Sequence, residues 1–215
     1  MEKARLDLYS TSMKLFKNIK KWLENQEHLF YLFLLILIVP NIILCFTEPM
    51  PVVAKVCNVL LPFAFYYLLM TLSRNCGKMF WILFLFIFFG AFQIVLLYLF
   101  GQSIIAVDMF LNLVTTNSSE AMELLDNLVP ALVSVIILYI PALILAAISI
   151  IKKRKLSPEF IRRERKKAWI ALLIGFISLG AAYGLDKRYE LKSDLYPANV
   201  CYNVALAFQR NAQTR

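Results

Sequence analysis

Long apolar runs alternate with short polar segments along the chain. A helix needs about 20 apolar residues to cross the hydrocarbon core of a bilayer, and five runs approach or reach this length. The backbone groups of a spanning segment must be satisfied internally, and the short alternation typical of an outer-membrane barrel is absent. The pattern therefore predicts an all-α membrane protein with five transmembrane helices. The predicted spans are residues 28–46, 52–72, 79–100, 128–151 and 168–184.

An amphipathic segment precedes the first predicted span. Between residues 5 and 25, apolar side chains recur every three or four positions, and lysines lie off this stripe. The spacing predicts a basic helix that lies on the cytoplasmic membrane surface; a partner-binding helix is the alternative. The apolar positions are Tyr9, Met13, Phe16, Ile19 and Leu23.

A second amphipathic helix is predicted after the fifth span, within a linker of residues 185–215. Pro197 suits the first turn of a helix. We expect this helix to lie along the outer leaflet. The sequence reaches its last residues, 211-NAQTR-215, without a cap or an apolar finish, so we expect a further domain to follow. The predicted apolar face holds Val200, Val204, Ala207 and Phe208.

The distribution of charge predicts the orientation. The chain is 60% hydrophobic and carries a net charge of +9, with a mean hydropathy of +0.68. Of the 23 Lys and Arg residues, 17 lie in segments 1–27, 71–78 and 152–167, which share one side if five spans alternate. Segment 101–127, on the other side, has four acidic residues and no Lys or Arg. Because positive charge stays cytoplasmic, we expect a cytoplasmic N-terminus and an outer C-terminus.

The same basic segments suit contacts with anionic lipid. Nucleic-acid binding is disfavoured because no base-stacking or groove-reading module accompanies the charge. The spans hold almost no ionisable residue, which argues against an ion-coupled transporter; Gln93 is the most polar group of the third span. Gly180 and Gly184 form a small-xxx-small pair, which we expect to pack within this chain. Cys45 and Cys57 are interpreted as small apolar helix residues, with a disulfide between them as the alternative.

The segment 115-TTNSSEAMELL-125 is polar and acidic between two apolar runs. Asn117 can cap the N-terminus of a helix that leads into the fourth span, and Glu120 then occupies the third helical position, as in a capping box. Glu120 and Glu123 also complement the helix dipole. Capping accounts for Asn117 and Glu120 but not for the polar residues that precede them.

Asn112, Thr116 and Glu120 are spaced by four residues, so on a continuous helix they share one face. A face of carboxylate, amide and hydroxyl groups suits a cationic headgroup, and the ammonium of phosphatidylethanolamine is a natural partner for a carboxylate. These three residues are the candidate substrate-binding site.

Asn112, the pair Thr116-Asn117 and the pair Glu120-Ala121, in this order on an outer loop, resemble the N-terminal membrane domain of the phosphoethanolamine transferases. This family includes the lipid A enzymes associated with polymyxin resistance. The five-span topology and the outer linker are similar as well, so the resemblance covers nearly the whole chain.

The resemblance implies a cytoplasmic helix (residues 1–27), a five-helix membrane domain (28–184) with its substrate loop at 101–127, and a periplasmic linker (185–215) that leads to a zinc-containing, sulfatase-like catalytic domain. Family members reside in the bacterial inner membrane. They transfer phosphoethanolamine from phosphatidylethanolamine to lipid A or a related glycan, and Asn112, Thr116 and Glu120 would contact the donor headgroup.

The outer segments of this chain contain no histidine. We therefore expect zinc and the catalytic residues to lie outside it, and the chain to anchor the enzyme and complete the donor site. Two alternatives remain. One is the membrane domain of a phosphoglycerol transferase of the lipoteichoic-acid synthase type, whose anionic donor suits an acidic loop poorly. The other is a small transporter or a non-enzymatic membrane scaffold.

Overall fold

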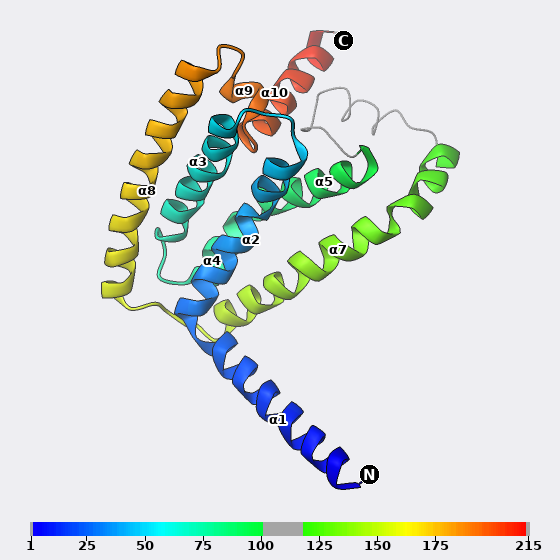
Figure 1. Ribbon diagram of the computed structural model, residues 1–215, viewed down its shortest axis with the longest axis vertical. Helices are drawn as coiled ribbons and strands as arrows, with labels where there is room; N and C mark the ends of the chain where they lie inside the picture. Colours follow the sequence, from blue (N-terminus) through cyan, green and yellow to red (C-terminus); the bar gives the residue numbers. More distant parts are fainter. Residues whose placement is uncertain (1, 101–117, 214–215) are drawn as a thin grey trace.

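The fold is built from helices (Figure 1). The computed structural model describes residues 2–100 and 118–213, and these contain no strand, which confirms the all-α prediction. The helices are α1 (Glu2–Glu24), α2 (Gln26–Thr47), α3 (Val52–Met70), α4 (Cys76–Ile82), α5 (Phe84–Phe100), α7 (Ser118–Ile151), α8 (Pro158–Leu185), α9 (Leu191–Asp194) and α10 (Ala198–Gln213).

Four helices, α2, α3, α7 and α8, are long and apolar enough to cross a membrane, and the bent pair α4–α5 makes a fifth if it is one span. The prediction of a continuous third span over 79–100 is therefore wrong: α4 and α5 meet at an angle of 62°. The break lies at Leu83, whose ψ of 12° is outside the α-helical range. Leu83 is neither proline nor glycine, the residues that usually mark a kink, so the sequence carries no signal for it.

Close approach of α3 and α8 depends on a glycine. A Cβ on Gly175 would lie 3.1 Å from the Cα of Leu61. By contrast, a Cβ on Gly180 or Gly184 would meet no atom within 4 Å. The prediction that the Gly180–Gly184 pair packs within this chain is therefore wrong among the residues that the structure describes, because the pair lies on a face of α8 that no neighbouring helix covers.

Gly77→Ala is expected to destabilise the bundle. A Cβ at Gly77 would lie 2.3 Å from the backbone oxygen of Ala146, so α4 and α7 would have to move apart. Overpacking of this kind costs about 1–3 kcal/mol. Thermal unfolding in detergent should show a melting temperature lowered by several degrees. Gly180→Ala, whose added methyl group enters open space, is the matched control and should leave the melting temperature unchanged. Equal decreases in melting temperature in both variants would contradict the close packing of α4 on α7.

The three basic segments gather at one end of the bundle. Arg74 Nε donates to the Leu156 carbonyl at 2.9 Å, and the Leu156 N–H donates to the Arg74 carbonyl at 2.7 Å. Asn75 Nδ2 donates to the Arg154 carbonyl at 2.9 Å, and Arg154 Nη1 reaches the Glu24 carbonyl at 3.3 Å. These bonds join the end of α1, the α3–α4 connection and the α7–α8 connection. We call this the basic end.

The predicted N-terminal helix is confirmed as α1, which projects from the basic end (Figure 1). The apolar side chains of Tyr9, Phe16 and Ile19 are exposed, whereas Leu23 packs against the core. The apolar stripe of α1 is thus free to meet another surface over most of its described length. Its position on a cytoplasmic membrane surface stays a prediction.

Candidate functional site

Of the three predicted headgroup residues, Glu120 lies in the described part of α7, which starts at Ser118. Asn117 precedes the described part of this helix, so the predicted cap stays a prediction. Asn112 and Thr116 lie outside the described residues. The shared face of Asn112, Thr116 and Glu120 therefore stays a prediction.

The length of α7 places its first turns beyond the hydrocarbon core. The helix has 34 residues, or about 51 Å at 1.5 Å per residue, whereas the hydrocarbon core is about 30 Å thick. Its last residue, Ile151, is followed at once by Lys152 at the basic end. Counted from there, about 20 residues fill the core, and the turns that carry Glu120 and Glu123 extend beyond it.

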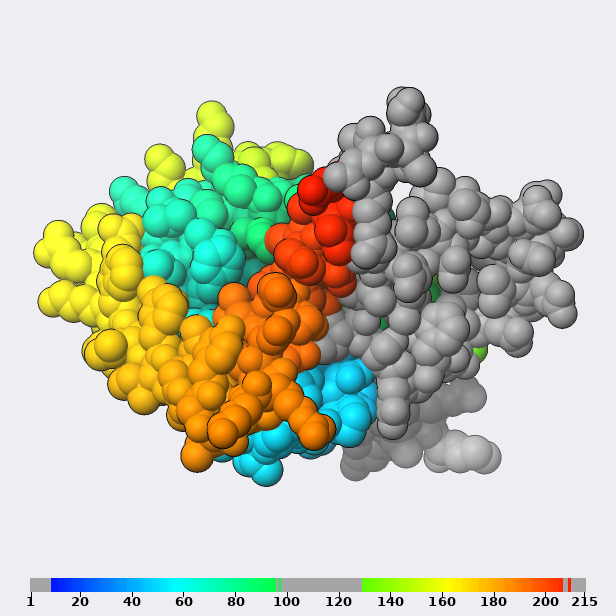
Figure 2. Space-filling view, turned by 90° about the horizontal axis from the view of Figure 1, so that it is seen from above, coloured from blue at the N-terminus to red at the C-terminus, as the bar shows by residue number. Residues whose placement is uncertain are grey.

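The segment after α8 packs back onto the same end of the molecule. The predicted helix after Pro197 is confirmed as α10, which begins at Ala198. Val200 on α10 is buried in a cluster with Leu44 of α2 and Leu97 of α5. Figure 2 views this end and shows the segment from the end of α8 through α10 running across it. We call it the far end; it also carries the end of α5 and the start of α7 (Figure 1).

Two asparagines inside the spans hold this segment in place. Asn58 Nδ2 donates to the Asp194 carbonyl at 2.7 Å, and the Tyr189 hydroxyl donates to Asn58 Oδ1 at 2.8 Å. Asn41 Nδ2 donates to the carbonyls of Tyr196 at 2.7 Å and Asn58 at 3.0 Å. We call this set of hydrogen bonds the asparagine clamp. It ties α2 and α3 to the chain that follows α8.

The protonation state of Tyr189 suits its role in the clamp. Burial raises the pKa of Tyr189 well above its usual range, and the neighbouring Cys57 thiol adds to the shift. The hydroxyl therefore stays protonated at neutral pH and remains a donor to Asn58.

Sequence analysis missed the clamp, because it noted Gln93 as the polar interior group and passed over Asn41 and Asn58. Gln93 is fully buried. The signal that could have found the clamp is the amide itself, since a polar side chain inside a membrane helix needs an interior partner.

An apolar groove of about 610 Å³ runs between α2, α5 and α7. Ser134 lies on its α7 wall, 14 residues from Glu120, which is about 21 Å along the helix. A lipid whose headgroup lies at the first turns of α7 could thus place its acyl chain in this groove. The lining residues are Leu32, Leu35, Ile36, Val39, Ile43, Ile94, Ser134, Ile137 and Leu138.

The basic segment contains one buried carboxylate, which sequence analysis also missed. The Glu164 side chain is 0% exposed. One carboxylate oxygen accepts from Arg163 Nε at 2.9 Å and from Lys167 Nζ at 3.0 Å, and the other accepts from the Tyr67 hydroxyl at 2.5 Å. Glu164 therefore joins α8 to α3 at the basic end, far from the candidate headgroup site.

Metal chemistry finds no support in the described part of the chain. Within residues 2–100 and 118–213, no group of three or more His, Cys, Asp and Glu side chains could hold a metal ion. These residues therefore do not fit a zinc site. All four cysteines are free thiols, and Cys45 and Cys57 lie in helices α2 and α3, which agrees with their interpretation as small helix residues.

We compared the chain with known protein families, curated proteins and solved structures. The chain matches no protein-family model, no curated protein and no solved structure.

Proposed function

We propose that this chain is the membrane domain of a phosphoethanolamine transferase, which moves phosphoethanolamine from phosphatidylethanolamine to lipid A or a related glycan. The observation that carries the proposal is the position of Glu120 in α7, before the stretch Val129–Ile151 that is apolar enough to cross a membrane, and at the end of the bundle opposite the basic segments. An acid at this position, with no lysine or arginine in segment 101–127 to neutralise it, favours a cationic headgroup.

In this proposal each site residue has a distinct task. The Glu120 carboxylate accepts hydrogen bonds from the donor ammonium, a charge-assisted contact about twice as strong as a neutral one. The Asn112 amide and the Thr116 hydroxyl can donate to the phosphate and accept from the ammonium. The acyl chain lies in the groove between α2, α5 and α7.

The proposed orientation follows from the basic end. Because Lys and Arg stay cytoplasmic, that end faces the cytoplasm, and the far end, with α10 and the linker, faces the periplasm of a bacterial inner membrane. A sulfatase-like domain beyond residue 215 would supply zinc and the nucleophile; no reaction step is assigned to the residues of this chain.

Two alternative functions stay open. A phosphoglycerol transferase of the lipoteichoic-acid synthase type would need to bind an anionic donor, which an acidic loop repels. A transporter or scaffold would need no headgroup preference.

The chain is expected to bind phosphatidylethanolamine in preference to phosphatidylglycerol. Native mass spectrometry of the chain from nanodiscs with equal amounts of the two lipids would count the lipids retained. We expect enrichment of phosphatidylethanolamine, and Glu120→Ala should reduce it by the share that is bound at the headgroup site. Asp126→Ala is the matched control, because Asp126 lies six residues along α7 and does not share the face of Glu120. Enrichment of phosphatidylglycerol would favour the phosphoglycerol transferase, and equal retention would contradict both enzymes.

A further inference from the structure

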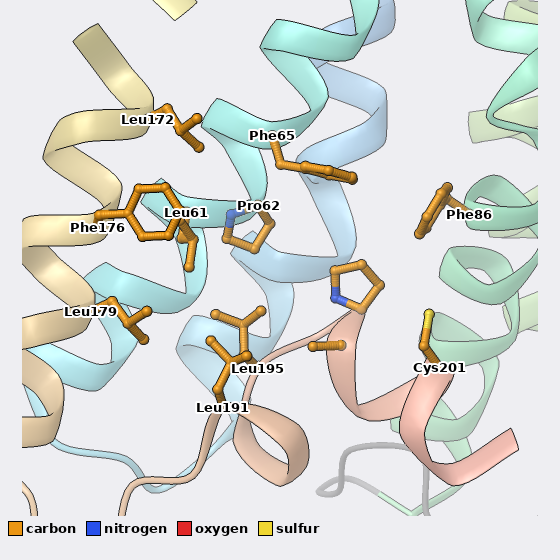
Figure 3. Close-up of a pocket in the computed structure, with 12 residues that line it drawn as sticks. Leu61, Pro62, Phe65, Phe86, Leu172, Phe176, Leu179, Leu191, Leu195 and Cys201 are labelled. Atoms are coloured by element: carbon orange, nitrogen blue, oxygen red, sulfur yellow. The ribbon is translucent and has the colours of Figure 1, made fainter. Parts of the chain in front are cut away.

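A second apolar groove lies on the other side of the bundle, between α3, α8 and the α9–α10 segment, with a volume of about 370 Å³ (Figure 3). Leu61 of α3 and Leu172 and Phe176 of α8 line one side of the groove, and Phe86 of α5 lies across from them. Cys201 of α10 lies at the side of the groove. Every side chain that lines it is apolar or a thiol.

The depth of the groove restricts what can fill it. Leu61, Leu172 and Phe176 belong to helices that are apolar enough to cross a membrane, and water does not occupy an apolar space of this kind. The side chains of Phe65 and Phe176 are 42% and 54% exposed, so the groove opens to its surroundings. At this depth the surroundings are acyl chains.

The outer end of the groove carries a pair of opposite charges. Lys192 follows Leu191, a lining residue, and its Nζ lies 5.7 Å from the ring centroid of Tyr202, the neighbour of Cys201. The Glu190 carboxylate lies 3.5 Å from the same Nζ, and both side chains are more than half exposed. An ammonium and a carboxylate side by side complement the phosphate and the amine of a zwitterionic headgroup.

We propose that this groove holds one acyl chain of a zwitterionic bilayer phospholipid, whose headgroup contacts Lys192 and Glu190. We call it the α3–α8 groove. The lipid is distinct from the proposed donor, because the donor groove lies between α2, α5 and α7 and shares no lining residue with this one. The bound lipid would fill the space between α3, α8 and α10.

The asparagine clamp keeps the outer end of the groove in place. Asn58 holds the Asp194 carbonyl, and Asp194 precedes Leu195, another lining residue. The groove therefore exists only when the segment after α8 is docked on the bundle.

Photocrosslinking tests the proposal directly. The chain is placed in nanodiscs with a phosphatidylethanolamine that carries a diazirine on one acyl chain, and crosslinked residues are mapped by mass spectrometry. We expect crosslinks on lining residues of α3, α8 and α10 together, up to about five-fold above those on Ile177, an exposed position of α8, since one exposed ion pair, here between Lys192 and the phosphate, contributes at most a factor of this size.

Two variants separate a bound lipid from bulk lipid. Cys201→Trp fills the groove from an exposed position and should reduce the groove crosslinks to the level at Ile177, a loss of up to about five-fold, with Ile177 labelling unchanged. Lys192→Gln should lower groove labelling in the same way without filling it, whereas Lys187→Gln should not. Glu120→Ala should leave it unchanged, because Glu120 is not part of this groove. Groove labelling equal to that at Ile177, or insensitive to Cys201→Trp, means contact with bulk lipid only and overturns the proposal.

Discussion

Asn58→Leu is expected to release the segment after α8 from the bundle. The substitution removes the donor to the Asp194 carbonyl and the acceptor of the Tyr189 hydroxyl. Tyr189 is 3% exposed, and its hydroxyl would keep only Cys57 Sγ, a weak acceptor at 3.7 Å. A buried polar group that loses its partner costs about 1–3 kcal/mol. Leucine is close to asparagine in size, so the loss comes from the hydrogen bonds rather than from a cavity.

Limited trypsin digestion in detergent measures this release, because Lys187, Arg188 and Lys192 lie in the segment that the clamp holds. The Asn58→Leu variant should be cut there several-fold faster than the unaltered chain. Val56→Leu, an exposed position of the same helix, is the matched control and should be cut at the original rate.

A double-mutant comparison separates the clamp from a general loss of stability. Asn41 and Asn58 act on the same segment, so Asn41→Leu combined with Asn58→Leu should accelerate cleavage by less than the product of the single effects. Multiplicative effects would mean that the two asparagines act independently and that the clamp is not one unit.

Hydropathy was sufficient to predict most of the spans, because a helix that is surrounded by lipid must be apolar along its whole length. Four of the five predicted spans are single helices, and α1 and α10 follow amphipathic spacing. The bend at Leu83 could not be predicted, because it lies within an unbroken apolar run and has no proline or glycine beside it.

The asparagine clamp could not be predicted from the sequence for a different reason. Asn41 and Asn58 bond to backbone carbonyls 155 and 136 residues away, and a carbonyl carries no sequence signature. An asparagine in a predicted span indicates that its side chain has a partner inside the bundle, but it does not indicate which residue that partner is. The same holds for Glu164, whose partner Tyr67 lies 97 residues away.

At the candidate headgroup site, the sequence carries more of the argument than the structure does. The apolar pattern predicted a helix here, and α7 is that helix from Ser118 onward. The cap stays a prediction, because Asn117 lies outside the described residues. Asn112 and Thr116 lie outside the described residues, so their part in the site rests on the four-residue spacing and on the resemblance. The charge of Glu120 carries most of the expected headgroup affinity.

Glu120→Ala is therefore expected to reduce phosphoethanolamine transfer more than any other single change in this chain. A hydrogen bond to a charged group contributes about 1.5–3 kcal/mol, and each 1.4 kcal/mol is a factor of ten. Transfer should fall by a factor of about 10 to 100. Glu120→Gln keeps an acceptor and the length of the side chain but loses the charge, so its transfer activity should lie between those of the unaltered enzyme and Glu120→Ala.

Glu120 also lies in the first turn of α7, where a carboxylate stabilises the helix start. If the loss of activity came from a frayed helix alone, Glu120→Gln would keep the activity of the unaltered chain, because Gln serves in a capping box as Glu does. The amount of each variant in the membrane, measured by immunoblot, controls for loss of the protein.

The most direct measurement is mass spectrometry of lipid A from cells that express the full reading frame containing this chain, with and without Glu120→Ala. Modification of lipid A or of a core glycan by phosphoethanolamine, reduced at least about ten-fold in the variant at equal membrane abundance, is the result that headgroup binding by Glu120 predicts. Phosphoethanolamine on no acceptor glycan, or full transfer by the Glu120→Ala variant, would contradict it.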